Sequence, residues 1–271
     1  MRSFKLFKYR DASYNISLYS VPAGEAAACE AAACEAVYNK ITGVIIHIRE
    51  SLEEYIKRHP DFLSSLEPVK LLPGAPPAAV MMAEAAELTG TGPMAAVAGA
   101  IAQLAAELSI QAAAESGIDE IIIENGGDIF ICPAENAAGR AQTGRPASPE
   151  RPPVTAGIFS GMHSRFSDLA LKIPAGASPA AVCSSSGRMG HSLSLGDCDL
   201  STVFSANAAL ADAAATLGGN LVSREGDLGP AAEKIMSIPG IEGVIIIKNS
   251  CISMAGRLPE LVKNTETVII G

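Results

Sequence analysis

IDEIIIENGGDIFIC, residues 118–132, decides the fold, because two apolar runs flank a short polar turn. The runs at 118–124 and 128–132 are rich in Ile, a residue that favours strands. Asn125-Gly126-Gly127 joins them, and Asn-Gly is a strong signal for a tight hairpin turn. The stretch therefore predicts a pair of antiparallel strands.

Further strand and helix patterns come in blocks on both sides of this hairpin. Helical spacing of apolar residues marks 24–36, 37–58, 77–88, 93–115, 206–218 and 229–237. Strand patterns mark 3–10, 14–20, 154–159, 168–173, 180–184, 201–205, 242–247 and 251–255, with a short strand closing the chain. Blocks of this kind indicate an α+β fold with antiparallel pairing. We expect a single domain over 1–271 with a flexible loop at 134–153, which is rich in Pro, Gly, Ala and Arg.

The composition narrows the class of protein. The 271 residues carry a net charge of −9, and their basic residues are scattered, so we expect no nucleic-acid partner. The N-terminus lacks the apolar stretch of a signal peptide, and no run of about 18 apolar residues predicts a membrane span. We expect a cytoplasmic protein whose six cysteines are reduced and mostly buried. The Ala-rich surface and antiparallel architecture favour a homo-oligomer.

The first candidate for chemistry is Thr89-Gly90-Thr91-Gly92-Pro93-Met94, which precedes an Ala-rich helix. Thr91 has the side chain of an N-cap residue, and proline suits the first helical turn. Free amide groups at a helix start bind phosphate well, so Thr91 and Gly92 are candidate ligand-binding residues. The alternative is an ordinary capped helix after a flexible loop.

Two other segments combine glycine with polar side chains. In Glu124–Asp128, the glycines permit either a plain hairpin turn with Asp128 in solvent or the close approach of a ligand. In Cys183-Ser-Ser185-Ser186-Gly187-Arg-Met-Gly-His191, hydroxyls and backbone amides follow a strand, which suits an anionic ligand. A plain strand-to-strand loop is the alternative there.

The last candidate is SANAALADAAAT, residues 205–216. Asp212 and Thr216 are four residues apart, so their oxygens lie on one face of the predicted helix. One carboxylate and one hydroxyl suit Mg²⁺, which takes few protein oxygens and keeps sites for water and phosphate. The alternative is a buried Asp212 bonded to a helix terminus, with Thr216 bonded back within its own helix.

The order of these segments resembles the ApbE-like superfamily of FAD:protein FMN transferases. The matching segments are Gly90–Met94, Gly126-Gly127-Asp128, Ser185-Ser186-Gly187 with His191, and Ala211-Asp212-Ala-Ala-Ala-Thr216. The Asp-x-x-x-Thr helix after a Ser-Gly loop is the most specific of them. The chain looks most similar to the short, cytoplasmic, uncharacterised branch of this superfamily from anaerobic bacteria and methanogens.

The resemblance implies an ApbE-like (T-fold-like) fold of antiparallel sheets flanked by helices, with a site for FAD or FMN. It implies that Asp212 and Thr216 ligate Mg²⁺, that Asp128 lines the nucleotide site and that His191 faces the phosphates. In a Mg²⁺-dependent enzyme, His191 or Asp128 would assist proton transfer. The residues implied to line the nucleotide site are Thr91, Gly92, Asn125, Gly126, Gly127, Ser185, Ser186 and Gly187. The chain departs from the family after His191, where HSLSLGDCD replaces an Asp-Pro-x-Thr-Gly stretch.

Three functions fit these observations. The first is a Mg²⁺-dependent transferase or hydrolase that acts on a flavin nucleotide or a related pyrophosphate ligand. The second is a protein of anaerobic sulfur assimilation, from sulfide to homocysteine or cysteine, with Cys183 and Cys198 as reactive thiols beside the Ser-Gly loop. The alternative, which we favour for each cysteine, is a small buried hydrophobic residue. The third is a flavin carrier without catalytic activity.

Overall fold

The computed structural model describes residues 2–20, 27–134, 151–158, 165–176, 179–187 and 196–264. His191 and most of the loop predicted at 134–153 lie outside these residues, and so do residues 24–26 of the first predicted helix. The predictions for them therefore stay predictions.

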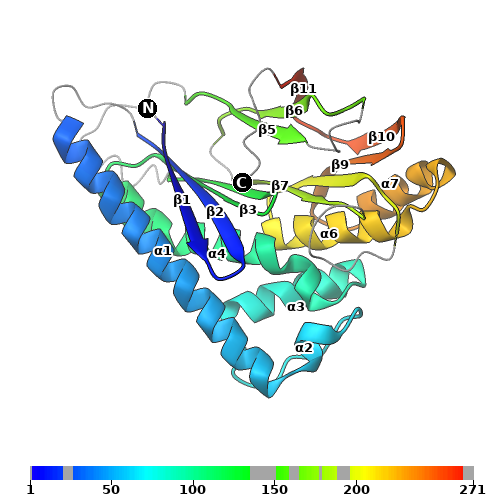
Figure 1. Cartoon of the computed structure of the whole chain (residues 1–271), viewed down its shortest axis with the longest axis horizontal. Helices are drawn as coiled ribbons and strands as arrows, with labels where there is room; N and C mark the ends of the chain where they lie inside the picture. The colour runs from blue at the N-terminus through cyan, green and yellow to red at the C-terminus, as the bar shows by residue number, and fades with distance from the viewer. Residues whose placement is uncertain are drawn as a thin grey trace.

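Two antiparallel sheets and a layer of helices form the fold, as the sequence predicted (Figure 1). The larger sheet has eight strands in the order β1-β2-β3-β4-β7-β8-β9-β10, and the smaller has three in the order β11-β6-β5. The strands are β1 Arg2–Tyr9, β2 Ala12–Tyr19, β3 Glu120–Asn125, β4 Asp128–Pro133, β5 Val154–Ile158, β6 Leu169–Ile173, β7 Ala180–Ser185, β8 Leu200–Ser205, β9 Ile241–Lys248, β10 Cys251–Gly256 and β11 Glu260–Lys263.

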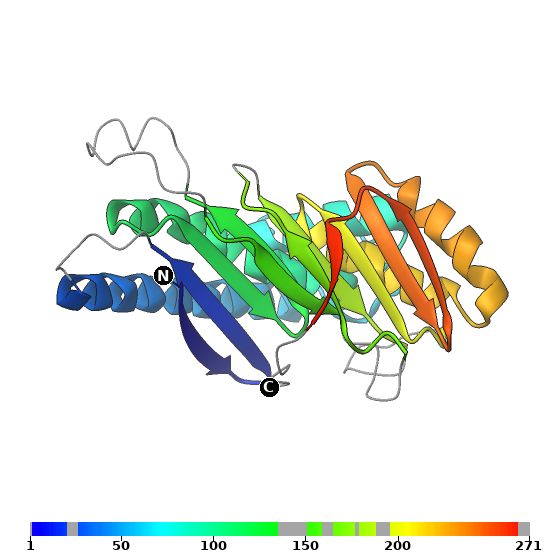
Figure 2. The ribbon, with the colours of Figure 1, turned by 90° about the horizontal axis from the view of Figure 1, so that it is seen from above.

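The helices cover one face of the large sheet, and the small sheet covers part of the other face (Figures 1 and 2). They are α1 Ala27–Arg58, α2 Asp61–Ser64, α3 Pro77–Thr89, α4 Val97–Glu115, α6 Ala208–Leu221 and α7 Leu228–Met236. Two 3₁₀ helices, η1 Pro93–Ala96 and η2 Glu225–Asp227, precede α4 and α7. The two N-terminal helical patterns form one continuous helix, α1, and the short helix α2 was not predicted.

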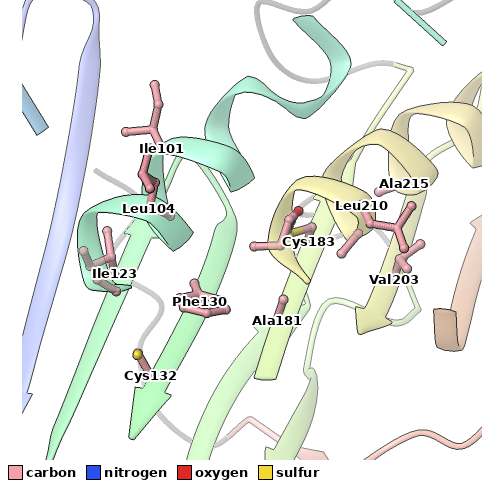
Figure 3. Close-up of a cluster of buried hydrophobic side chains, with 14 of the residues drawn as sticks. Ile101, Leu104, Ile123, Phe130, Cys132, Ala181, Cys183, Val203, Leu210 and Ala215 are labelled. Atoms are coloured by element: carbon pink, nitrogen blue, oxygen red, sulfur yellow. Dashed lines mark hydrogen bonds between the residues drawn. The ribbon is translucent and has the colours of Figure 1, made fainter. Parts of the chain in front are cut away.

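The core lies in two layers because each strand of the large sheet alternates its side chains between the faces. Toward the helices, Ile123 and Phe130 of the β3–β4 hairpin pack with Ile101 and Leu104 of α4 (Figure 3). Toward the small sheet, apolar residues of both sheets form a separate cluster, to which Ile122 and Leu171 belong. The central strands are thus buried on both faces.

Within the described residues, Pro93–Glu115 is the one helical stretch long and apolar enough to cross a membrane. It consists of η1 and α4, and 56% of its most apolar window is buried. Because α4 packs against α1, α6, β3 and β4, its apolar composition is explained by its place in the core.

Candidate functional site

Two predicted site residues, Asp128 and Asp212, lie close together at the helix side of the large sheet, where strands β4 and β7 pack against helices α4 and α6. Asp128 opens β4, which pairs with β7. Asp212 lies in α6, which packs on β7 and on α4. Both carboxylates are almost fully buried, with 5% of Asp128 and 8% of Asp212 exposed.

Asp212 bonds the start of another helix. Its Oδ2 accepts the N–H of Gly99 in the first turn of α4 at 2.9 Å, and the N–H of Ala98 also stabilises the carboxylate. Burial outweighs these amides and raises the pKa of Asp212 to about 7. The hydrogen bond matches the second interpretation of Asp212 given above. A carboxylate has about four lone-pair sites, so two amide bonds leave room for a further ligand.

Asp128 is buried, which overturns the interpretation of its turn as a solvent-exposed one. Its Oδ1 accepts the N–H of Ser184 at 3.2 Å, and the thiol of Cys183 is a second hydrogen-bond partner. Burial raises the pKa of Asp128 well above its ordinary value, and the charge of Asp212 raises it further. The structure therefore places the two acids close enough to influence each other's ionisation.

The turn before Asp128 has the backbone that its sequence predicted. Gly126 and Gly127 have φ angles of 65° and 102°, in the left-handed region that glycine tolerates best. The Asn125 side chain donates from Nδ2 to the carbonyl of Ala98 at 3.2 Å. This contact ties the hairpin to the same helix start that Asp212 bonds.

Thr91 and Gly92 lie one 3₁₀ turn before α4, and their described contacts are with other residues than the two acids. Thr91 bonds the hydroxyl of Thr89 at 2.8 Å, while Gly92 packs so closely that a Cβ there would lie 1.9 Å from the carbonyl oxygen of Ser65. The predicted N-cap role of Thr91 is wrong, since the helical stretch begins at Pro93 with Gly92 as its N-cap. The Gly99 amide of α4 is also not free for phosphate, because Asp212 occupies it.

Ser185, Ser186 and Gly187 end β7 beside this cluster. Ser186 is buried, and the N–H of Gly187 donates to the carbonyl of Cys198 at 2.9 Å. Thr216 is half-buried, one turn after Asp212 in α6. The described residues contain no group of three or more His, Cys, Asp or Glu side chains arranged to hold a metal ion.

A family model described as "AbpE bacteria" matches residues 26–234. This chain belongs to that family. The match spans most of the chain and confirms the resemblance to ApbE-like proteins.

Relatives of the ApbE-like chain are found among archaea. It is 37% identical to a UPF0280 protein of Methanococcus maripaludis strain C7 over 84% of this chain and 85% of that protein. It is 35% identical to a UPF0280 protein of Archaeoglobus fulgidus over 83% of this chain and 85% of that one.

Solved structures with similar topology include the ApbE protein of Thermotoga maritima, with a TM-score of 0.49 and 14% identity over 98% of this chain and 97% of that chain. A second is the flavin transferase ApbE of Vibrio cholerae, with a TM-score of 0.42 and 12% identity over 94% and 97% of the two chains.

Cys183 and Cys198, the thiols considered for sulfur chemistry, have the environment of inert cysteines. Cys183 is fully buried, and its Sγ donates to the carbonyl of Ala208 at 3.4 Å beneath the first turn of α6 (Figure 3). Burial and the neighbouring acids Asp128 and Asp212 raise the pKa of its thiol well above the ordinary value. Cys198 is also fully buried, and burial raises its pKa to about 11. Reactive cysteines need a lowered pKa, so this environment favours a packing role.

Two residues where the start of α4 contacts the start of α6, Gln103 and Gly99, were not predicted from the sequence. The Gln103 side chain accepts the N–H of Ala208, the first residue of α6, at 2.7 Å. A Cβ on Gly99 would lie 2.2 Å from the carbonyl oxygen of Ala208. Gly99 stood out only as a small residue in an Ala-rich helix, and Gln103 as a polar residue in an apolar one.

Proposed function

We propose that this chain binds a flavin nucleotide, or a related pyrophosphate ligand, together with Mg²⁺ at the junction of the β3–β4 turn, α4 and α6. The observation that carries this proposal is the pair of buried acids, Asp128 and Asp212, whose pKa values are raised by burial. Two adjacent carboxylates in a buried site resist ionising together. A divalent cation relieves this cost by pairing with the ionised form.

The donor atoms suit Mg²⁺ rather than a softer metal. Asp212 and Thr216 offer a carboxylate and a hydroxyl oxygen on one helix face, and Mg²⁺ is usually held by one or two protein carboxylates together with phosphate and water. Mg²⁺ supplies charge neutralisation at the phosphates and at the leaving oxygen. Family membership and the order of the motifs favour a flavin nucleotide as the ligand.

The chain's own groups give this site the means to move a proton. In the proposed reaction an acceptor hydroxyl or water attacks the phosphorus on the FMN side of the FAD pyrophosphate, the bond from this phosphorus to the bridging oxygen breaks, and AMP leaves with that oxygen. The attacking group must lose a proton, and the negative charge that develops on the leaving phosphate must be neutralised. Asp128, whose pKa is raised well above its ordinary value by burial, is suited to hold and release a proton, as general acid–base catalysis requires.

The direct test is a titration of the purified protein with FAD, followed by flavin fluorescence, with and without Mg²⁺. Asp212→Asn keeps an oxygen that accepts the Gly99 N–H but removes the charge, so the fold is retained. We expect its Mg²⁺-dependent FAD affinity to fall at least about a hundredfold, since changes merely beside a metal ligand already cost about 10- to 100-fold.

Asp11→Asn is the matched control, because it makes the same chemical change in the β1–β2 turn, where Asp11 pairs with Arg49. It should bind as the unaltered protein does. Mg²⁺-dependent binding that survives in Asp212→Asn would refute the proposed site. Prolonged incubation with FAD and Mg²⁺, followed by chromatography of the nucleotide, then distinguishes turnover to FMN and AMP from a carrier.

A further inference from the structure

The first turns of α4 and α6 touch at the backbone. Gly99 permits this contact, because a Cβ at its position would lie 2.2 Å from the carbonyl oxygen of Ala208 and 3.0 Å from the Cβ of Asp212. The amide groups of a first helical turn have no partner within their own helix. Two such turns in a buried junction therefore need acceptors from elsewhere.

Each helix supplies an acceptor to the other. Gln103 of α4 accepts the N–H of Ala208 through Oε1 at 2.7 Å, and Asp212 of α6 accepts the N–H of Gly99 through Oδ2 at 2.9 Å. In both helices the acceptor stands four residues after the donor, so it lies on the same face one turn later. The result is a reciprocal pair of caps that we call the helix-start interlock, formed by Gly99, Gln103, Ala208 and Asp212.

Gln103 is itself held in place. It is 8% exposed, and its Nε2 donates to Oε1 of Glu107 at 2.9 Å, one turn further along α4. The N-cap of α6, Asn207, accepts only the N–H of Leu210 through its side chain. Gln103 thus supplies the acceptor for the first amide of α6, the helix that carries Asp212.

We propose that Gln103 is a positioning residue, which fixes the start of α6 and thereby holds Asp212 against α4 and beside Asp128. Because Asp212 is the metal ligand in the proposed function, the effect of Gln103 on Mg²⁺ rests on that function. The effect of Gln103 on the Asp212–Gly99 hydrogen bond does not rest on that function, so it can be measured in the protein without Mg²⁺ or FAD.

The first measurement is amide hydrogen exchange in Gln103→Leu, which has nearly the same volume without the acceptor. Gln111→Leu is its matched control, since Gln111 lies on the same helix and also bonds a glutamate one turn later, Glu115, but does not reach α6. We expect exchange at Gly99, as well as at Ala208, to quicken about tenfold in Gln103→Leu, the size of one lost hydrogen bond. Exchange at Gly99 that matches Gln111→Leu would overturn the proposal.

Gln103→Glu guards against a general loss of structure. Combined with Glu107→Gln, which replaces the facing carboxylate with an amide that can donate, it keeps an oxygen to accept the Ala208 N–H, so exchange at Gly99 should return to within about threefold of the unaltered protein. Faster exchange at Gly99 in both Gln103 variants alike would mean that the amide oxygen of Gln103 does not position Asp212, and the proposal would fail.

The second measurement is the Mg²⁺ concentration that gives half-maximal FAD binding. Gln103→Leu should raise it about tenfold while Gln111→Leu leaves it unchanged, as expected for a residue beside a metal ligand. If Asp212→Asn abolishes Mg²⁺-dependent binding but Gln103→Leu does not weaken it, the positioning role is refuted and the proposed function stands. If the unaltered protein shows no such binding, the proposed function fails, and the exchange at Gly99 alone decides the role of Gln103.

Discussion

Carboxylates are buried in two regions at the large sheet, and the groups that stabilise the charged form differ between them. At the start of β3, Glu120 is 2% exposed and accepts a hydrogen bond from Nη2 of Arg2 at 2.8 Å. Burial raises its pKa, but the charges of Arg2 and Arg151 work against that shift. At the helix-start interlock, Asp212 is buried to a similar degree, and the groups that lower its pKa are the backbone amides of Gly99 and Ala98.

This difference separates a structural ion pair from a site that gains by binding a cation. Arg2 and Arg151 already offset part of the cost of burying the charge of Glu120. Burial instead raises the pKa of both Asp212 and Asp128, and the charge of Asp212 raises that of Asp128 further, so a metal ion bound there would compete with protons.

The largest expected difference between the two regions is in the stability of their variants. Glu120→Gln leaves the partly buried guanidinium of Arg2 without its carboxylate, and breaking a largely buried ion pair of this kind costs about 3 kcal/mol in the free energy of unfolding. Asp212→Asn removes a desolvated charge while keeping the acceptor for Gly99, so at pH 8 it should leave stability unchanged or raise it. Urea denaturation of both variants measures the contrast, and equal losses would contradict it.

The second prediction concerns pH. Asp212 has a folded-state pKa of about 7, raised above the ordinary value of about 3.9, so the folded state binds more protons than the unfolded state between these values. Its contribution to stability is therefore complete below about pH 4 and is lost as the pH rises towards 7, at up to about 1.4 kcal/mol per pH unit.

Mg²⁺ should reverse this loss by pairing with the ionised acid. Thermal unfolding at pH 5 and pH 8 should show a larger Mg²⁺-induced rise in Tm at pH 8. In Asp212→Asn both the pH dependence and the Mg²⁺ effect should shrink. A rise in Tm of the same size at both pH values would show that the cation does not act through this acid.

The sequence predicted the local features of these regions well. The β3–β4 turn follows from Asn125-Gly126-Gly127, whose glycines adopt the left-handed backbone expected of them. The helices that carry Gly99 and Asp212 follow from their Ala-rich periodicity. The N-cap assigned to Thr91 failed because a 3₁₀ turn beginning at Pro93 precedes α4 and takes Gly92 as its cap.

Contacts between distant segments were beyond the sequence. Asp128 is buried because β4 pairs with β7, some fifty residues later in the chain, and the N–H of Ser184 on β7 then meets its carboxylate. The role of Gln103 depends on the crossing of α4 and α6, whose contacting residues are more than a hundred positions apart. The periodicity of a helix predicts which of its faces is buried but not which other helix packs on that face. The sequence around Gln103 therefore could not predict a contact with α6.

The smallest expected effect concerns the second proposed metal ligand, Thr216. If its hydroxyl joins Asp212 in holding Mg²⁺, Thr216→Val should raise the Mg²⁺ concentration for half-maximal FAD binding about tenfold, the low end of the range for changes around a metal. Thr216→Ser keeps the hydroxyl and should bind nearly as the unaltered protein does. Since Thr216 is only half-buried, both variants should keep their stability within about 1 kcal/mol. Equal Mg²⁺ dependence in the two variants would mean that Thr216 bonds only within its own helix, and the acid pair would then be the whole of the protein's contribution to the metal.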